Sequence, residues 1–268
     1  MSFVFTSLFL FALGAAVGSF INVFVYRSVR SETWVKGRSR CDFCKKTLKS
    51  FDKIPLLSFL FLRGKTHCCK KKLSLAHPVV EFISGTLFVW WYWGGSLFFQ
   101  LTVQPLKILQ PIFWLFVAII LLGIFVSDLL YMIIPDILLA ILLVLAVVYR
   151  IILVSLGFMQ IHDFLWMIFG AMLLTSLFAA LFFITKGKGF GLGDVKFALP
   201  MGLLLAWPNI LLGVFLSFIF GSIVGLLLLA LKKKKFGQVI PFGPFLILGT
   251  VTALLFGDSL WSWYIGIL

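Results

Sequence analysis

Two aspartates, Asp128 and Asp194, are the side chains of this chain best suited to chemistry. The sequence has nine acidic residues in 268, and these two lie at the ends of hydrophobic stretches, where a charge is costly and usually functional. Paired carboxylates can catalyse hydrolysis, because one takes a proton from water while the other, protonated, donates to the carbonyl under attack. Since like charges repel, such a pair shares a proton and titrates in two coupled steps. The two residues therefore predict an acid/base couple that needs no nucleophilic side chain.

A glycine-rich segment precedes Asp194, with glycines at positions 187, 189, 191 and 193. Glycine adopts positive φ and lets another backbone approach closely. The segment therefore indicates a backbone shaped to receive an extended substrate, with Gly191, Gly193 and Lys196 supporting it. The alternative is a flexible turn in which Asp194 caps the next helix, because Asp is a favoured N-cap. The two roles are compatible.

The elements that position these residues are hydrophobic stretches of membrane-spanning length. The chain is 62% hydrophobic and 12% charged, which is far from the composition of soluble globular proteins. Crossing about 30 Å of hydrocarbon takes roughly 20 helical residues. On that basis we expect eight spans, at about 3–25, 79–99, 109–127, 137–157, 164–185, 195–207, 209–231 and 240–257. The sixth is short, and 195–231 could instead be one helix broken near Trp207-Pro208, because proline removes a backbone donor.

The expected fold is thus an all-α polytopic membrane protein of about eight transmembrane helices. Three regions follow: the first transmembrane helix at 1–25, a basic loop domain with four cysteines at 26–78, and a transmembrane core at 79–268. Residues 1–24 carry no cation, whereas a signal peptide has its positive charge before the apolar core. We therefore expect the first span to remain as an anchor.

The basic residues predict the orientation, because loops rich in Lys and Arg stay in the cytoplasm. The loop 26–78 holds fourteen of the 23 basic residues, and placing it inside leaves only Lys107 and Arg150 towards the outer side. The N-terminus is then outside. The net charge of +14 becomes mainly a topology signal beside anionic lipid, and we expect no nucleic-acid partner.

This topology brings Asp128 and Asp194 to the cytoplasmic side. Asp163 and Asp258 fall on the outer side and cannot join them, whereas Asp136, beside Pro135, is cytoplasmic and competes with Asp128. The convergence comes from Lys and Arg counts that took no account of the aspartates. It favours a hydrolase active site at the cytoplasmic membrane surface.

Six segments, taken in order, resemble the type IV prepilin peptidases, which are aspartyl proteases with a Gly-x-Gly-Asp motif. They cover nearly the whole chain and read Gly18-Ser-Phe-Ile-Asn-Val-Phe-Val-Tyr-Arg27, Cys41-Asp-Phe-Cys44, Pro78-Val-Val-Glu81, Asp128-Leu-Leu-Tyr-Met-Ile-Ile-Pro-Asp136, Gly191-Leu-Gly-Asp-Val-Lys196 and Ile240-Pro-Phe-Gly-Pro244. The resemblance implies that Asp128 and Asp194 are the catalytic pair and that Asp136 starts a helix or supports the site.

The resemblance also implies a function. Members of that family remove the basic leader of prepilins or pseudopilins at the cytoplasmic face of the bacterial inner membrane, and many then methylate the new N-terminus with S-adenosylmethionine. The implied partners are prepilin or pseudopilin substrates and membrane lipids. The spacing of this chain shows no motif for that cofactor, so methylation rests on the resemblance.

The four cysteines, Cys41, Cys44, Cys68 and Cys69, all lie in the basic loop. A reducing cytoplasm disfavours disulfides, and a Cys-x-x-Cys facing further thiols predicts a structural Zn²⁺ site. The family pattern has a second Cys-x-x-Cys, but here its first position is Thr66. The fourth ligand therefore stays open: Cys68 would share the ion with its neighbour Cys69, which is geometrically awkward, or His67 would complete a Cys₃His site. The alternative is four reduced thiols in a solvated loop.

Two other classes of protein compete with the peptidase. A proton-coupled transporter would use Asp128 and Asp194 as a relay, although transport carboxylates tend to lie near the membrane midplane rather than at span ends. A non-catalytic scaffold of a secretion or pilus machine would not need both aspartates.

Glu81 is a further acidic residue with two possible roles. It pairs with the basic loop or with Lys196, or it is a carboxylate favoured at a helix start by the helix dipole.

Overall fold

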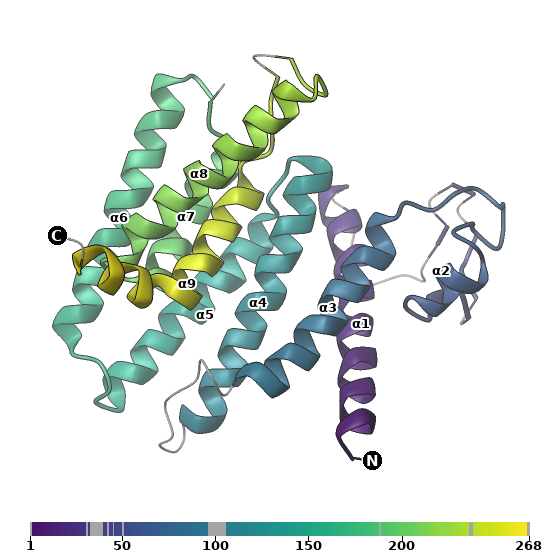
Figure 1. The fold of residues 1–268 in the computed structure, drawn as a ribbon, viewed down its shortest axis with the longest axis horizontal. Helices are drawn as coiled ribbons and strands as arrows, with labels where there is room; N and C mark the ends of the chain where they lie inside the picture. The colour runs from purple at the N-terminus through teal and green to yellow at the C-terminus, as the bar shows by residue number, and fades with distance from the viewer. Residues whose placement is uncertain are drawn as a thin grey trace. The chain divides into compact units, whose positions relative to one another are not determined.

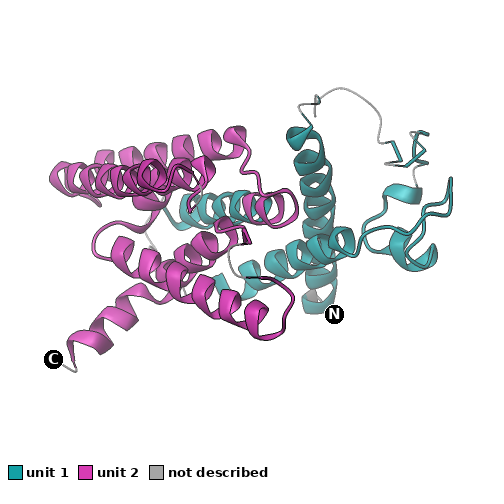
Figure 2. Ribbon diagram, turned by 90° about the horizontal axis from the view of Figure 1, so that it is seen from above, with its two compact units in different colours: residues 1–123 teal, residues 124–268 magenta. Residues whose placement is uncertain are grey.

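The computed structural model describes residues 2–30, 32, 40–41, 43–44, 46–49, 51–95, 106–187, 189–235 and 238–266. The chain divides into two compact units, Met1–Gly123 and Ile124–Leu268, which Figure 2 colours separately. Throughout the described ranges the regular elements are helices, and β-structure is limited to two isolated bridges, Arg40 with Thr47 and Lys65 with Lys72. The predicted all-α class is confirmed.

In the first unit, α1 (Ser2–Val29) packs against α3 (Ala76–Gly94). The crossing is lined by small residues: a Cβ added at Gly14 would lie 2.5 Å from the Ser84 carbonyl oxygen, and one at Gly18 would lie 2.8 Å from the Glu81 Cα. Glycines four residues apart allow apolar helices to approach this closely. The α1–α3 pair is therefore close at its backbones, and aromatic contacts such as Phe11 with Phe82 add to it.

The loop between these helices contains the short elements η1 (Phe51–Lys53) and α2 (Leu57–Phe61). It is tied to α3 by Glu81, whose Oε2 accepts the backbone N–H of Leu56 at 2.8 Å. The Glu81 side chain is buried. Glu81 therefore contacts the loop, as one of its two expected roles requires, but the contact is a hydrogen bond from the loop backbone.

The second unit is built around α7 (Leu192–Leu205), which contacts α5 (Asp136–Ser155), α6 (Ile161–Ile184), α8 (Asn209–Ala230) and α9 (Gly243–Ile265) (Figure 1). It also includes the end of α4 (Leu106–Tyr131). Phe197, Ala198 and Met201 of α7 are fully buried. Where α7 meets α6, a Cβ at Gly202 would lie 2.6 Å from the Ala171 Cα. A short buried helix thus carries Asp194 at its N-terminal end.

Six of the described helices are long and apolar enough to cross a membrane: α1, α4, α5, α6, α8 and α9. The expected total of eight is not confirmed. The spans expected at 79–99 and 195–207 fall on α3 and α7, which are not among the six, and residues 96–99 lie outside the described residues. With 14 residues, α7 is about 21 Å long at 1.5 Å per residue, shorter than the about 30 Å of hydrocarbon in a bilayer.

The chain breaks between α7 and α8 where proline predicts it. Helix α7 ends at Leu205, Ala206 has a φ of 61°, and Pro208 is the N-cap of α8. A proline ring clashes with the preceding turn of a helix and removes a donor. The stretch 195–231 therefore forms two helices.

Candidate active site and metal centre

Asp128 lies near the end of α4 and is 6% exposed. Its Oδ2 accepts the backbone N–H of Gly243, the first residue of α9, at 2.9 Å. A Cβ at Gly243 would lie 2.6 Å from that same oxygen, so the carboxylate fits against α9 because this residue is glycine. The N-terminus of a helix favours negative charge, and α9 therefore offers Asp128 both a donor and a favourable dipole.

Asp194 lies in the first turn of α7 and is 7% exposed. Its Oδ2 accepts the backbone N–H of Gly191 at 3.1 Å, as in a capping box. The sequence offered Asp194 itself as the N-cap, but the structure places Gly191 there and Asp194 at the third helical position. Asp194 therefore does contribute to capping, but from the third helical position. The N-cap is Gly191, which has an extended conformation.

The pKa of Asp194 is raised to about 6, first by burial and further by the negative charge of Asp128, while the Gly191 N–H opposes the rise. A carboxyl group with a pKa near the working pH can both hold and release a proton, as general acid/base catalysis requires.

The turn after α4 brings the start of α7 towards Asp128. Ser127, which is fully buried, donates to the Ile133 carbonyl at 2.7 Å and closes the turn. Gly193 then lies against this turn, because a Cβ there would be 3.1 Å from the Ile134 Cβ. Gly193 thus permits a close approach of the Ile134 side chain.

Asp136 and Lys196 form an ion pair of 2.7 Å with side chains that are 73% and 44% exposed. Asp136 is the first residue of α5, in keeping with the helix-start role that the resemblance implies. From the sequence, Asp136 is an alternative to Asp128 as a member of the catalytic pair. Its side chain is exposed, whereas Asp128 and Asp194 are both buried. Lys196 contacts this helix-start acid.

The remaining acids of the second unit lie away from the pair. Asp163 is in the first turn of α6, whose other end leads to the glycine-rich segment. Asp258 accepts the side-chain N–H of Asn209 at 3.1 Å and stands fifteen residues along α9 from Gly243, or about 22 Å at 1.5 Å per residue. Each of these acids therefore lies towards the end of its helix that is remote from the segment beside Asp194 or Asp128.

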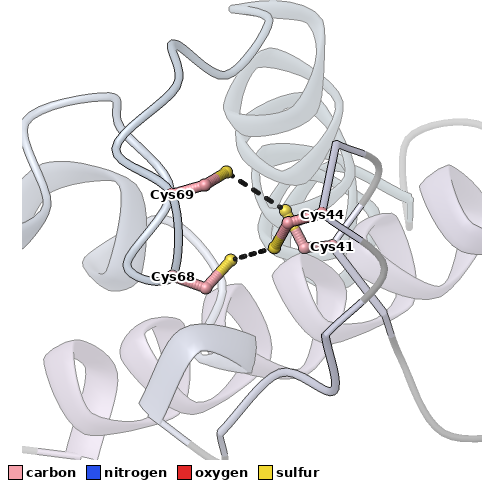
Figure 3. Close-up of side chains that lie close together, drawn as sticks. All are labelled: Cys41, Cys44, Cys68 and Cys69. Carbon is pink, nitrogen blue, oxygen red and sulfur yellow. Dashed lines mark hydrogen bonds between the residues drawn. The ribbon is translucent and has the colours of Figure 1, made fainter.

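The sulfur atoms of Cys41, Cys44, Cys68 and Cys69 all lie within 4.8 Å of one another (Figure 3). Cys41 and Cys69 are 3.8 Å apart and Cys44 and Cys68 are 3.0 Å apart. All four are free thiols. A tetrahedral Zn²⁺ bound at about 2.3 Å needs sulfurs about 3.8 Å apart, so the four thiols fit this ion. The adjacent Cys68 and Cys69 both reach the cluster, whereas His67 is not part of it.

Thr66 is a member of this site that sequence reasoning noticed only as a departure from the family pattern. Its hydroxyl lies 3.1 Å from the Cys69 sulfur and accepts the Lys71 backbone N–H at 3.0 Å. The hydrogen bond from the Thr66 hydroxyl, and after it one from the Lys71 backbone N–H to the Cys69 sulfur, lower the pKa of the Cys69 thiol to about 7. Thr66 therefore favours the thiolate form that binds a metal.

Gly243 is the second residue whose role was missed. The signal available in the sequence was the segment from Ile240 to Pro244, which the resemblance singled out without a function. Its role depends on a contact between residues 115 positions apart. No local pattern encodes such a contact.

These features define a polytopic helical membrane protein with a pair of buried aspartates at helix ends and a separate cluster of four thiols. Two family models match the chain. Residues 12–94 match the bacterial peptidase A24 N-terminal domain, and residues 114–226 match the type IV leader peptidase family. The cysteines lie in the first match and both aspartates in the second.

Curated relatives match over almost the full chain. The prepilin leader peptidase/N-methyltransferase of Stutzerimonas stutzeri is 30% identical over 280 residues, which cover 94% of this chain and 91% of that protein. The same-named proteins of Legionella pneumophila and Bacillus subtilis (strain 168) are 31% identical over 275 residues and 28% identical over 260 residues. The former match covers 94% of this chain and 91% of the relative, and the latter covers 96% of each. No solved structure matches the chain.

The chain belongs to the type IV leader peptidase family. It is therefore an enzyme of the peptidase class and a multi-pass membrane protein. The transporter and scaffold alternatives are not favoured, because the matched family is one of peptidases.

Proposed function

We propose that Asp128 and Asp194 are the catalytic pair of an endopeptidase that removes the leader from a type IV prepilin or pseudopilin. The observation that carries the proposal is the burial of both carboxylates, each of which has one oxygen on a glycine N–H at the start of a helix. The names of the relatives indicate the substrate.

The reaction needs one proton on the pair. The ionised carboxylate takes a proton from a water molecule as the water oxygen attacks the scissile carbonyl, and the protonated carboxyl donates to the carbonyl oxygen. The tetrahedral gem-diol intermediate then collapses: its C–N bond breaks as the protonated carboxyl donates to the leaving nitrogen, while the ionised carboxylate takes a proton from one of the two hydroxyls, so that the leader departs with a new carboxyl group. The pair ends with one proton, as it began, so it can turn over again.

Cleavage of a prepilin by membranes containing the protein tests this assignment. We expect Asp128→Asn and Asp194→Asn each to abolish cleavage, because an amide can neither take up nor deliver the required proton. Asp136→Asn is the matched control, since it changes an exposed acid of the same unit, and it should still cut. If Asp128→Asn cuts at the wild-type rate, the catalytic pair is assigned wrongly.

We also propose a place and an orientation for the site: the bacterial inner membrane, with the N-terminus outside and the aspartates facing the cytoplasm. The support is the distribution of Lys and Arg and the family's peptidase activity on leader peptides. In this arrangement residues 26–78 form a cytoplasmic loop domain and residues 79–268 form the peptidase core.

The thiol cluster is proposed as a structural Zn²⁺ site held by Cys41, Cys44, Cys68 and Cys69. When bound, the ion would cross-link a basic loop of about fifty residues, which is short for a chain that must fold on a core of its own. Metal analysis of the purified protein should find about one zinc per chain. Cys68→Ser should lose it and His67→Ala should keep it; the opposite pattern would assign the fourth ligand to His67.

Methylation of the new N-terminus is the second proposed activity, with S-adenosylmethionine as the methyl donor. Its support is the N-methyltransferase part of the relatives' names. The mass of pilin matured by this protein decides the point. A mature N-terminus carrying one additional methyl group is expected, and an unmodified one in the presence of the methyl donor would remove the activity.

A further inference from the structure

Two phenylalanine–glycine pairs stand behind the two aspartates, and we propose that their contacting rings set the spacing between the carboxylates. Phe190 precedes Gly191, whose N–H donates to Asp194, and Phe242 precedes Gly243, whose N–H donates to Asp128. The inference rests on the proposed function of the aspartates. It adds Phe190 and Phe242 as positioning residues of the same site.

The two rings are in direct contact with each other. Their centroids are 5.2 Å apart and their planes are inclined by 69°, an edge-to-face arrangement. Aromatic rings favour this geometry, because the positive edge of one meets the negative face of the other. The backbone donor of Asp194 is thereby joined to the backbone donor of Asp128 through a single ring–ring contact.

Further rings hold this pair in place. Phe178 of α6, which is fully buried, lies 5.1 Å from Phe190 between ring centroids. Phe218 of α8 lies 5.3 Å from Phe242 and 6.1 Å from Phe190. The two donors are therefore fixed relative to α6 and α8, and neither ring can shift without displacing its neighbours.

The link between ring and donor is short and stiff. The N–H of each glycine belongs to the same planar peptide unit as the carbonyl of the phenylalanine before it, so the Cα of the phenylalanine and the donor move together. The carboxylates follow the donors closely: an added Cβ would lie 3.3 Å from the Asp194 oxygen at Gly191 and 2.6 Å from the Asp128 oxygen at Gly243. A displaced ring therefore displaces a carboxylate.

Spacing matters here because the two carboxylates must share one proton and act on one peptide bond. Misplacing a catalytic group by about 1 Å can lower a rate roughly 100-fold. Simple core packing is the competing explanation, and it predicts that the more deeply buried ring matters more. Phe245 allows the comparison, because it contacts Phe242 at 6.4 Å and is buried, whereas Phe190 and Phe242 are half-buried, and it does not precede a donor glycine.

The experiment compares Phe190→Leu, Phe242→Leu, the double variant and Phe245→Leu for prepilin cleavage, with thermal stability measured for each. We expect Phe190→Leu and Phe242→Leu to lower kcat by roughly 10- to 100-fold, with little change in KM and an altered pH profile of kcat. The double variant should be hardly worse than the worse single one, because the rings act as one unit. Phe242→Tyr, which keeps the ring, should restore cleavage.

Phe245→Leu separates positioning from packing. It should lower the melting temperature with a much smaller loss of kcat. If it lowers kcat as much as Phe242→Leu at equal stability, or if the two single losses simply add, the rings only pack and the proposal fails.

Hydrogen exchange gives a readout that does not depend on cleavage. In Phe242→Leu, amide exchange should become faster in residues 189–195, which are far from position 242 along the chain, because the ring contact to Phe190 is lost. Unchanged exchange there would overturn the proposal. If wild type cuts no prepilin, or if Asp128→Asn still cuts, the proposed function fails instead, and the exchange result still decides whether the two glycine donors are coupled.

Discussion

The carboxyl group of Asp194 contributes both to the fold and to the proposed chemistry. Its hydrogen bond to Gly191 starts α7 and uses Oδ2. A carboxylate has two acceptor oxygens, so this bond does not use up the group. The same burial that makes the bond effective raises the pKa of Asp194. Helix initiation and acid/base behaviour are therefore consequences of one position.

The raised pKa of Asp194 predicts a pH-dependent stability. The value is about 6 in the folded protein against 3.8 for an unperturbed group, so the folded state binds this proton more tightly than the unfolded chain. The resulting stability is fully present below about pH 4 and is lost as the pH rises through about 6. Asp194→Asn removes this titration.

Thermal unfolding in detergent measures the effect. Asp194→Asn should raise the melting temperature relative to wild type more at about pH 7.5 than at about pH 4.5, since only the ionised carboxylate is penalised by burial. An equal difference at the two pH values would show that burial does not raise the pKa of Asp194.

The close approach of glycines to the carboxylates predicts a graded loss of cleavage. Gly243→Ala places a Cβ 2.6 Å from the Asp128 oxygen, and Gly191→Ala places one 3.3 Å from the Asp194 oxygen. We expect the first to cost roughly 100-fold or more in cleavage rate and the second to cost less. Gly225→Ala in α8 is the control, because its Cβ meets nothing within 4 Å. Equal rates for the Gly243 and Gly225 variants would contradict this account.

At the scale of the element, α7 is a short helix held at both ends. At its start, the Asp194 carboxylate accepts the backbone N–H of the N-cap residue Gly191. At the other end, the Arg150 guanidinium of α5 donates to the Leu203 and Leu204 carbonyls at 3.3 and 3.0 Å. The last carbonyls of a helix lack partners within it, and a cation there also complements the dipole. Arg150 thus secures the helix whose opposite end carries Asp194.

Replacing Arg150 should therefore destabilise the second unit. Arg150→Met leaves two carbonyls at a buried helix end without these donors, at about 1–3 kcal/mol each. Arg150→Lys keeps the charge but not the planar fork that reaches two carbonyls, so its stability should be intermediate. Chemical or thermal unfolding of the three proteins gives the order. A Met variant as stable as wild type would show that the α7 carbonyls find other partners.

At the scale of the whole molecule, the apolar helices and the basic loop have the distribution expected of a membrane protein. Six of the described helices could cross a bilayer, and the chain carries 23 basic against nine acidic residues. The basic residues concentrate in 26–78, which precedes α3. Positive loops stay in the cytoplasm, so this distribution supports the proposed orientation.

Reporter fusions check that orientation in cells. A periplasm-active reporter should be silent when fused after residue 70 and active when fused after residue 158, because the first site follows the basic loop and the second lies between α5 and α6. The reverse pattern would invert the topology. It would also place Asp128 and Asp194 on the outer side.

Much of this protein was predictable from local sequence. Hydrophobic length predicted the helices, and proline predicted the break before α8, because both depend on neighbours along the chain. The resemblance implied the helix-start position of Asp136, and the clustering of thiols indicated a metal-binding loop. Asp128 and Asp194 stood out because a charge beside an apolar stretch is costly wherever the rest of the chain lies.

Tertiary structure decided the rest. It made α7 a short buried helix rather than a full span, brought Cys68 rather than His67 into the thiol cluster, and gave Asp128 the N–H of Gly243 as a partner. It also brought the Phe190 and Phe242 rings into contact. These features depend on side chains that are distant in sequence and meet only after packing, and their energies come from burial and close approach rather than from local propensity.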